Sequence, residues 1–237
     1  GSGTSDVFVA KFKANGDPEW KHEYGTPNDE FASSLSRGSD GSLYVSAEVH
    51  GLMPSGTAAP ANSYGEGADA AVLRFDKNGV WTWTRQFGGS GSEVPTAVAT
   101  GPGGDIWVYG HTSGDLAGQV GGNDVFLARY GSSGSFKWRK WVGSTDHDFS
   151  GDVAVSPNGA IYVGGYTFGI VTGDDAVSNP NSDVFLARYG SDGSRAWVHQ
   201  IGTPTPYEAG FGATAETFEL PEDTEDERRE RSERIQS

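Results

Sequence analysis

Nine acidic residues lie in glycine-rich segments between the apolar runs of this 237-residue chain. Carboxylate oxygens in such segments are ligands that Ca²⁺ takes, in flexible geometry. No D-x-D-x-D-G type of loop is present, so two interpretations stay open: a calcium site, or acids that are simply solvated. These candidate binding residues are Asp29, Glu30, Glu93, Asp115, Asp146, Asp148, Asp174, Asp175 and Glu208.

Signatures of catalysis are missing from the sequence. It contains no H-E-x-x-H, G-x-S-x-G, P-loop or dinucleotide-binding motif. The absence of cysteine excludes a disulfide framework, a thiolate metal site and a cysteine nucleophile. His147 lies between Asp146 and Asp148, but a lone loop of this kind is typical of a polar surface. The sequence therefore predicts a protein without catalytic residues.

Four copies of one 20-residue pattern organise the elements that must position these acids. The copies begin at Asp6, Asp69, Asp124 and Asp183. Counting from each Asp, a basic residue stands at +5, glycine at +10, tryptophan at +14 and glycine at +19. We expect the basic residue to form a repeated ion pair or to stack on an aromatic ring. The repeated Asp itself is expected to hydrogen-bond a turn or strand edge.

A second half follows the first three copies. It contains a run of small residues, a turn glycine at +35 and an aromatic residue at +38 inside segments such as AIYVGGYT. Each repeat then reads as four strands, with the small-residue strand first and the Trp-containing strand last. Repeats of this length with four strands predict an all-β fold, a β-propeller of four-stranded antiparallel blades. In that fold the long loops between the second and third strands share one face with the turns between successive blades, so the nine acids are expected there.

The repeats divide the chain into two parts. Residues 1–220 are predicted to form about four blades, either closed on themselves or part of a larger propeller. They begin with the third and fourth strands of one blade and end with a small-residue strand at 209–216. Residues 221–237, rich in Glu and Arg, are predicted to be a charged tail, either a short helix or disordered.

The segments DVFVAKFKANGDPEW, FGGSGSE and GAIYVGGYT resemble the bacterial β-propeller repeat family known as SBBP, which is similar to the NHL propellers. The resemblance covers about residues 6–202. It implies a propeller, usually of seven or eight blades, in secreted or cell-surface proteins without an enzymatic role. The chain departs from the family in having fewer than four complete repeats.

The net charge of −15 argues against nucleic acid and anionic membranes as partners. No apolar run approaches the length needed to span a bilayer. We therefore expect an extracellular or cell-surface protein, with the periplasm as an alternative. It would bind a protein or glycan, or assemble with copies of itself or other subunits as a structural part, with calcium as its one candidate cofactor. The alternative is a propeller enzyme acting on polysaccharide or another surface substrate.

Overall fold

A computed structural model describes residues 5–53, 67–114, 116, 118, 122–171 and 182–202. Within this part of the chain the structure is all-β, and its one helical element is a 3-10 turn at Pro102–Gly104. The strands form four separate antiparallel sheets, named A to D in chain order. The prediction of an all-β fold is confirmed.

Sheet A is a hairpin of β1 (Val7–Phe12) and β2 (Pro18–Tyr24). The other three sheets have four strands each, in sequential order. Sheet B holds β3 (Glu30–Arg37), β4 (Leu43–Val49), β5 (Asp69–Phe75) and β6 (Trp81–Phe87). Sheet C holds β7 (Glu93–Thr100), β8 (Ile106–Thr112), β9 (Asp124–Tyr130) and β10 (Phe136–Val142). Sheet D holds β11 (Asp148–Val155), β12 (Ile161–Thr167), β13 (Asp183–Tyr189) and β14 (Arg195–Ile201).

The turns between strands follow from local sequence. Between β5 and β6, Gly79 has a φ of +80°, a left-handed conformation that glycine adopts without steric cost. Asp76 closes this turn because its Oδ1 accepts hydrogen bonds from the backbone N–H groups of Asn78 and Val80, both at 2.8 Å. Turns with a positive-φ glycine at +10 also connect the two strands of sheet A and the third and fourth strands of sheets C and D, as the repeated glycine predicts.

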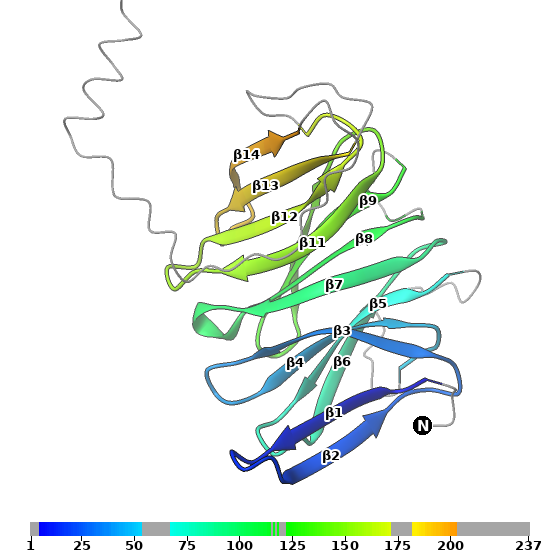
Figure 1. Ribbon diagram of the computed structural model, residues 1–237, viewed down its shortest axis with the longest axis vertical. Helices are drawn as coiled ribbons and strands as arrows, with labels where there is room; N and C mark the ends of the chain where they lie inside the picture. The colour runs from blue at the N-terminus through cyan, green and yellow to red at the C-terminus, as the bar shows by residue number, and fades with distance from the viewer. Residues whose placement is uncertain are drawn as a thin grey trace, which may run out of the picture.

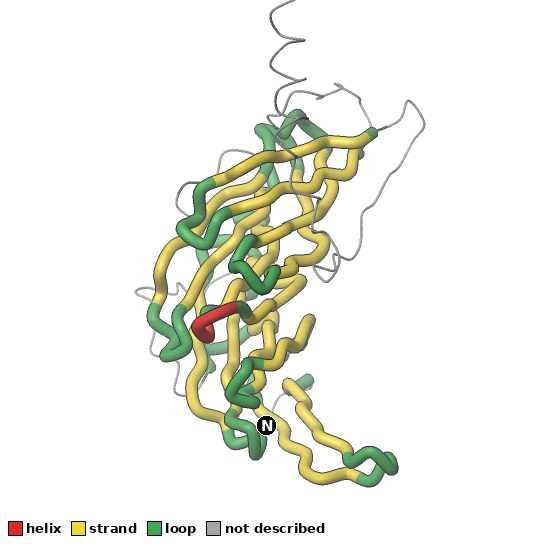
Figure 2. The backbone as a smooth tube through the Cα atoms, turned by 90° about the vertical axis from the view of Figure 1, so that its left-hand side faces the viewer, coloured by secondary structure: helices red, strands yellow, loops and turns green. Residues whose placement is uncertain are grey.

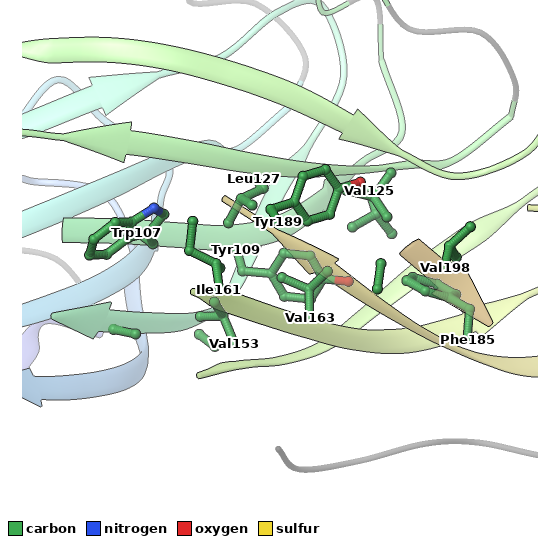
Figure 3. Close-up of a cluster of buried hydrophobic side chains, with 14 of the residues drawn as sticks. Trp107, Tyr109, Val125, Leu127, Val153, Ile161, Val163, Phe185, Tyr189 and Val198 are labelled. Atoms are coloured by element: carbon green, nitrogen blue, oxygen red, sulfur yellow. The ribbon is translucent and has the colours of Figure 1, made fainter. Parts of the chain in front are cut away.

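The sheets stack along the long axis of the molecule (Figure 1), and apolar side chains fill the junctions between them. Neighbouring sheets pack through their first strands, with β3 on β7 and β7 on β11. The third strands of the two inner sheets, β5 and β9, are buried on both faces. Figure 3 shows the junction of sheets C and D, where Leu127 and Trp107 face Ile161 and Tyr189. Burial of this apolar surface is the main force that holds the stack together.

The basic residue at +5 takes the role that the sequence predicts. The Arg129 guanidinium lies 5.6 Å from the ring centroid of Trp107, the aromatic residue at +38 of the same sheet, and it also pairs with Asp105. Arg74 stacks in the same way on Tyr44 and Arg188 on Tyr162. These cation–π contacts tie the second strand of each four-stranded sheet to the third.

The four sheets form a curved arc in which sheet A and sheet D lie at opposite ends (Figures 1 and 2). The described sheets therefore do not close into a ring. The strand predicted at 209–216 and the tail at 221–237 lie outside the described residues, as do the long loops at 54–66 and 172–181.

Candidate functional site at the loop end

The loop end of the stack is the edge where the turn between successive sheets lies beside the loop that follows the second strand. The predicted acids differ in where the structure places them. Glu30, Glu93 and Asp148 are fully buried, Asp29 is half-buried and Asp146 is exposed. Asp115, Asp174, Asp175 and Glu208 lie outside the described residues. The three buried carboxylates belong to the interior of the fold and are not part of an exposed acidic face.

Each buried carboxylate closes the turn that joins two sheets. The backbone N–H of Gly89 donates to Glu93 Oε2 at 2.7 Å, and the Thr112 hydroxyl at the end of β8 donates to Glu93 Oε1 at 2.6 Å. In the same way Thr26 N–H donates to Glu30 at 2.9 Å, and Ser144 N–H donates to Asp148 at 2.6 Å. These acids occupy position +24 in three copies, four residues after the N–H donor. The regular spacing is the sequence signal for this structural role.

The electrostatics of these carboxylates agree with a structural role. Burial raises the pKa of Glu93, and the nearby Asp69 raises it further. Burial also raises the pKa of Asp148 and of Asp69. Asp69 and Glu93 both lie against Gly88, the glycine at +19, where a Cβ would collide with each carboxylate. The glycine at +19 is thus required by the close approach of the two acids.

A glutamine fixes the start of the loop after the second strand, a feature that the sequence reasoning missed. Gln86 Nε2 donates to Asp69 Oδ2 at 2.7 Å and to the Gly51 carbonyl at 3.0 Å, while its Oε1 accepts from Met53 N–H at 3.0 Å. Gln200 repeats the arrangement in sheet D with its own Asp, Gly and Val171. The sequence signal that could have revealed this arrangement is a Gln at +17 in two copies, directly before Phe-Gly or Ile-Gly. The sequence predicts that the repeated Asp hydrogen-bonds a turn or strand edge, whereas in these two copies it accepts a hydrogen bond from the glutamine side chain.

Aromatic rings gather beside these groups in sheets C and D. Phe149 stacks on Tyr166 with a centroid distance of 4.9 Å, and the edge of His111 meets it at 5.2 Å. Phe168 lies 6.3 Å from Phe149 and is exposed, and His147 stacks at 6.5 Å. The rings of this cluster come from three separate segments of the chain that no sequence motif connects.

His111 and Ser150 form a hydrogen-bonded pair at this cluster. His111 Nδ1 lies 3.0 Å from Ser150 Oγ, which also accepts the Thr96 hydroxyl at 2.9 Å. Burial lowers the pKa of His111 to about 4, so the imidazole is neutral near pH 7. A base this weak is poorly matched to activating a serine hydroxyl, and Ser150 itself is buried. The pair therefore fits a structural contact between sheets C and D.

Among the described residues no three His, Cys, Asp or Glu side chains are placed together to hold a metal ion. Four of the nine acids lie outside the described ranges, so calcium stays a prediction. No helix in the described part of the chain is long and apolar enough to span a membrane.

Taken together, the described site defines a repetitive all-β scaffold whose buried polar groups serve the fold. No protein-family model matches the chain. The regulatory protein FlaEY of Caulobacter vibrioides is 28% identical over 165 residues. That match covers 65% of this chain but 17% of the relative, so the chain spans less than one fifth of its length.

Two solved structures of proteins of unknown function are also similar. The structure from Dyadobacter fermentans is 12% identical in sequence, and the match has a TM-score of 0.45. It covers 82% of this chain and 57% of the Dyadobacter chain. The structure from Bacteroides caccae is 11% identical in sequence, and the match has a TM-score of 0.32. It covers 89% of this chain and 81% of the Bacteroides chain. None of these three proteins is described as an enzyme.

Proposed function

We propose that this chain is a non-catalytic β-propeller module that serves as a structural subunit of a secreted or cell-surface assembly. In this proposal sheets A to D are successive blades, with β3, β7 and β11 nearest the propeller axis. The sequential order of four antiparallel strands and the contacts between successive first strands support it. So does the SBBP resemblance of the repeats.

One observation carries the structural role: the polar groups of the loop end are used within the fold, whereas large apolar side chains stay exposed at both ends of the stack. Phe8 and Phe12 are exposed on sheet A, and Leu186 and Ile201 on sheet D. Exposed apolar patches of this kind mark association surfaces.

Photocrosslinking from single positions tests this role. We expect p-benzoylphenylalanine at position 8 or 186 of the purified chain to crosslink to another polypeptide. The matched control is position 80, because Val80 is as exposed as Phe8 but lies in the turn between β5 and β6 and not on the outer side of sheet A or D. Crosslinking that is absent, or equal at position 80, contradicts a structural subunit that associates through its ends.

Glycan binding at the loop end is a second candidate, favoured by the exposed ring of Phe168 beside Tyr166. Aromatic faces next to a few polar groups are typical of small-ligand sites. The test is a glycan-array screen of the chain and of Phe168→Ala, with Phe136→Ala as the control for loss of an exposed ring in another sheet. Signals that both variants retain equally would remove this candidate.

A further inference from the structure

Every junction between neighbouring sheets is built from the same repeat positions. Residues at +1 and +3 of one sheet's third strand pack against residues at +2, +4 and +6 of the next sheet. At the junction of sheets C and D these are Val125 and Leu127 against Phe185, Ala187 and Tyr189. The same positions meet at the other two junctions: Ala70 and Val72 against Phe126, Ala128 and Tyr130, and Val7 and Val9 against Ala71, Leu73 and Phe75.

Sheet A carries one half of this junction with nothing described against it. Phe8, Ala10 and Phe12 occupy +2, +4 and +6, and we name them the N-face. Phe8 is 55% exposed, whereas Phe126 and Phe185 at the same position are 0% exposed. The difference is one of neighbours and not of residue type, because the side chain is phenylalanine in all three copies.

Sheet D carries the other half. Its outer side presents Tyr162, Val184, Leu186 and Ile201, which we name the C-face. Leu186 at +3 is 37% exposed where Leu127 is 0% exposed, and Ile201 at +18 is 63% exposed where Val142 is 1% exposed. Cross-strand pairing of Val184 with Ile201 places these two side chains on one side of the sheet.

The two faces cannot cover each other within the described chain, since sheets A and D lie at opposite ends of the arc (Figure 2). The N-face and the C-face are complementary. Each internal junction already joins two surfaces that are built from the same repeat positions as these two faces. A surface that joins to a different surface of an identical chain makes a heterologous contact, which forms a ring when the rotation closes.

We infer that a second copy of this chain covers both faces, with the N-face of each copy packed on the C-face of the other. This inference rests on the proposed structural role and names its partner and geometry. A curved stack is the shape that a closed ring requires, so the pairing is taken to be a ring of two copies and not an open filament. The contact would continue the register of the three internal junctions, with Phe8 of one copy seated against Val184 and Leu186 of the other.

Complementation between variants tests this pairing. The N-face variant is Phe8→Thr with Phe12→Thr, and the C-face variant is Leu186→Thr with Ile201→Thr. Threonine is compatible with strands, and the replaced side chains are exposed, so both variants should fold, as circular dichroism would verify. Val80→Thr is the control for loss of an exposed apolar side chain.

Light scattering after size-exclusion chromatography should give twice the 25.0 kDa chain mass for the wild type and the control. Each face variant alone should be monomeric, and an equimolar mixture of the two should regain the dimer through the one intact pair of faces. A monomeric wild type, an open filament, or a mixture that stays monomeric overturns the inference. Crosslinking from position 8 that persists while the mixture fails would leave the structural role standing and remove only head-to-tail pairing.

Discussion

Phe126 in the middle of the stack and Phe8 at its end occupy the same position of the same repeat, yet one is buried and the other exposed. Their strands carry nearly the same residues, VFLARY and VFVAKF. What differs is the presence of a preceding sheet, because sheet B covers Phe126 and nothing described covers Phe8. The repeat thus builds surfaces for a neighbour at every position, including the ends, where the described part of the chain does not supply one.

Removing the two phenylalanine rings should give the largest contrast between these regions. Phe126→Ala leaves a cavity between sheets B and C and should lower the free energy of unfolding by about 3–5 kcal/mol. Phe8→Ala should cost less than ~1 kcal/mol in the monomer, since its ring is already solvated. Urea unfolding with fluorescence detection measures both.

Protein concentration sharpens this contrast. If a second copy covers the N-face, the cost of Phe8→Ala grows with protein concentration, whereas the cost of Phe126→Ala does not. Equal costs for the two variants at low concentration would show that the end of the stack is packed like its middle.

A histidine inside a junction and one outside it should differ in how they change the pH dependence of the free energy of unfolding. His111, between sheets C and D, has a folded pKa of about 4, below its ordinary value of 6.5. The stability linked to this histidine is fully present above pH 6.5 and is lost as pH falls toward 4. The loss is up to about 1.4 kcal/mol per pH unit over that range.

The measurement is a series of urea midpoints between pH 7 and pH 4. His111→Gln should flatten the wild-type decline, since it removes the group that must charge in a buried site. His22→Gln in sheet A is the control for losing a histidine from the end of the stack. A decline that is unchanged in His111→Gln would mean that other groups cause it.

How far the sequence predicts this structure depends on whether a feature is local. The turn at Gly79 and the stacking of Arg129 on Trp107 are decided within one repeat, so spacing alone predicts them. The burial of Glu93 was not predicted, because a charged residue in a glycine-rich turn resembles a solvated one until its donors from Gly89 and Thr112 are seen. Exposure of Phe8 depends on a neighbouring sheet, which no pattern inside the repeat records.

Gln86 and Glu23, both at +17, offer a smaller contrast between the middle and the end. Gln86→Ala leaves Asp69 and the start of the loop at Gly51 without their buried donor, at a cost of roughly 1–3 kcal/mol. Glu23 is exposed on sheet A, so Glu23→Ala should change stability by no more than ~0.5 kcal/mol. Thermal unfolding compares them, and a neutral Gln86→Ala would contradict a stabilising role for the Gln86 hydrogen bonds.

The smallest contrast concerns the basic residue at +5. Arg129 stacks on Trp107 and pairs with Asp105 in sheet C, so Arg129→Ala should cost about 1–2 kcal/mol. In the described part of the chain, no counterpart of β4, β8 or β12 pairs with β1 to give Lys11 an aromatic partner. Lys11 instead pairs at 2.9 Å with the exposed Glu19. Surface pairs of this kind contribute about 0–1 kcal/mol, and a double-mutant cycle on Lys11 and Glu19 should give a value in that range. A coupling energy as large as that of Arg129 with Asp105 would mean that the end hairpin is covered in solution, which would itself point to the neighbour that the N-face is built to receive.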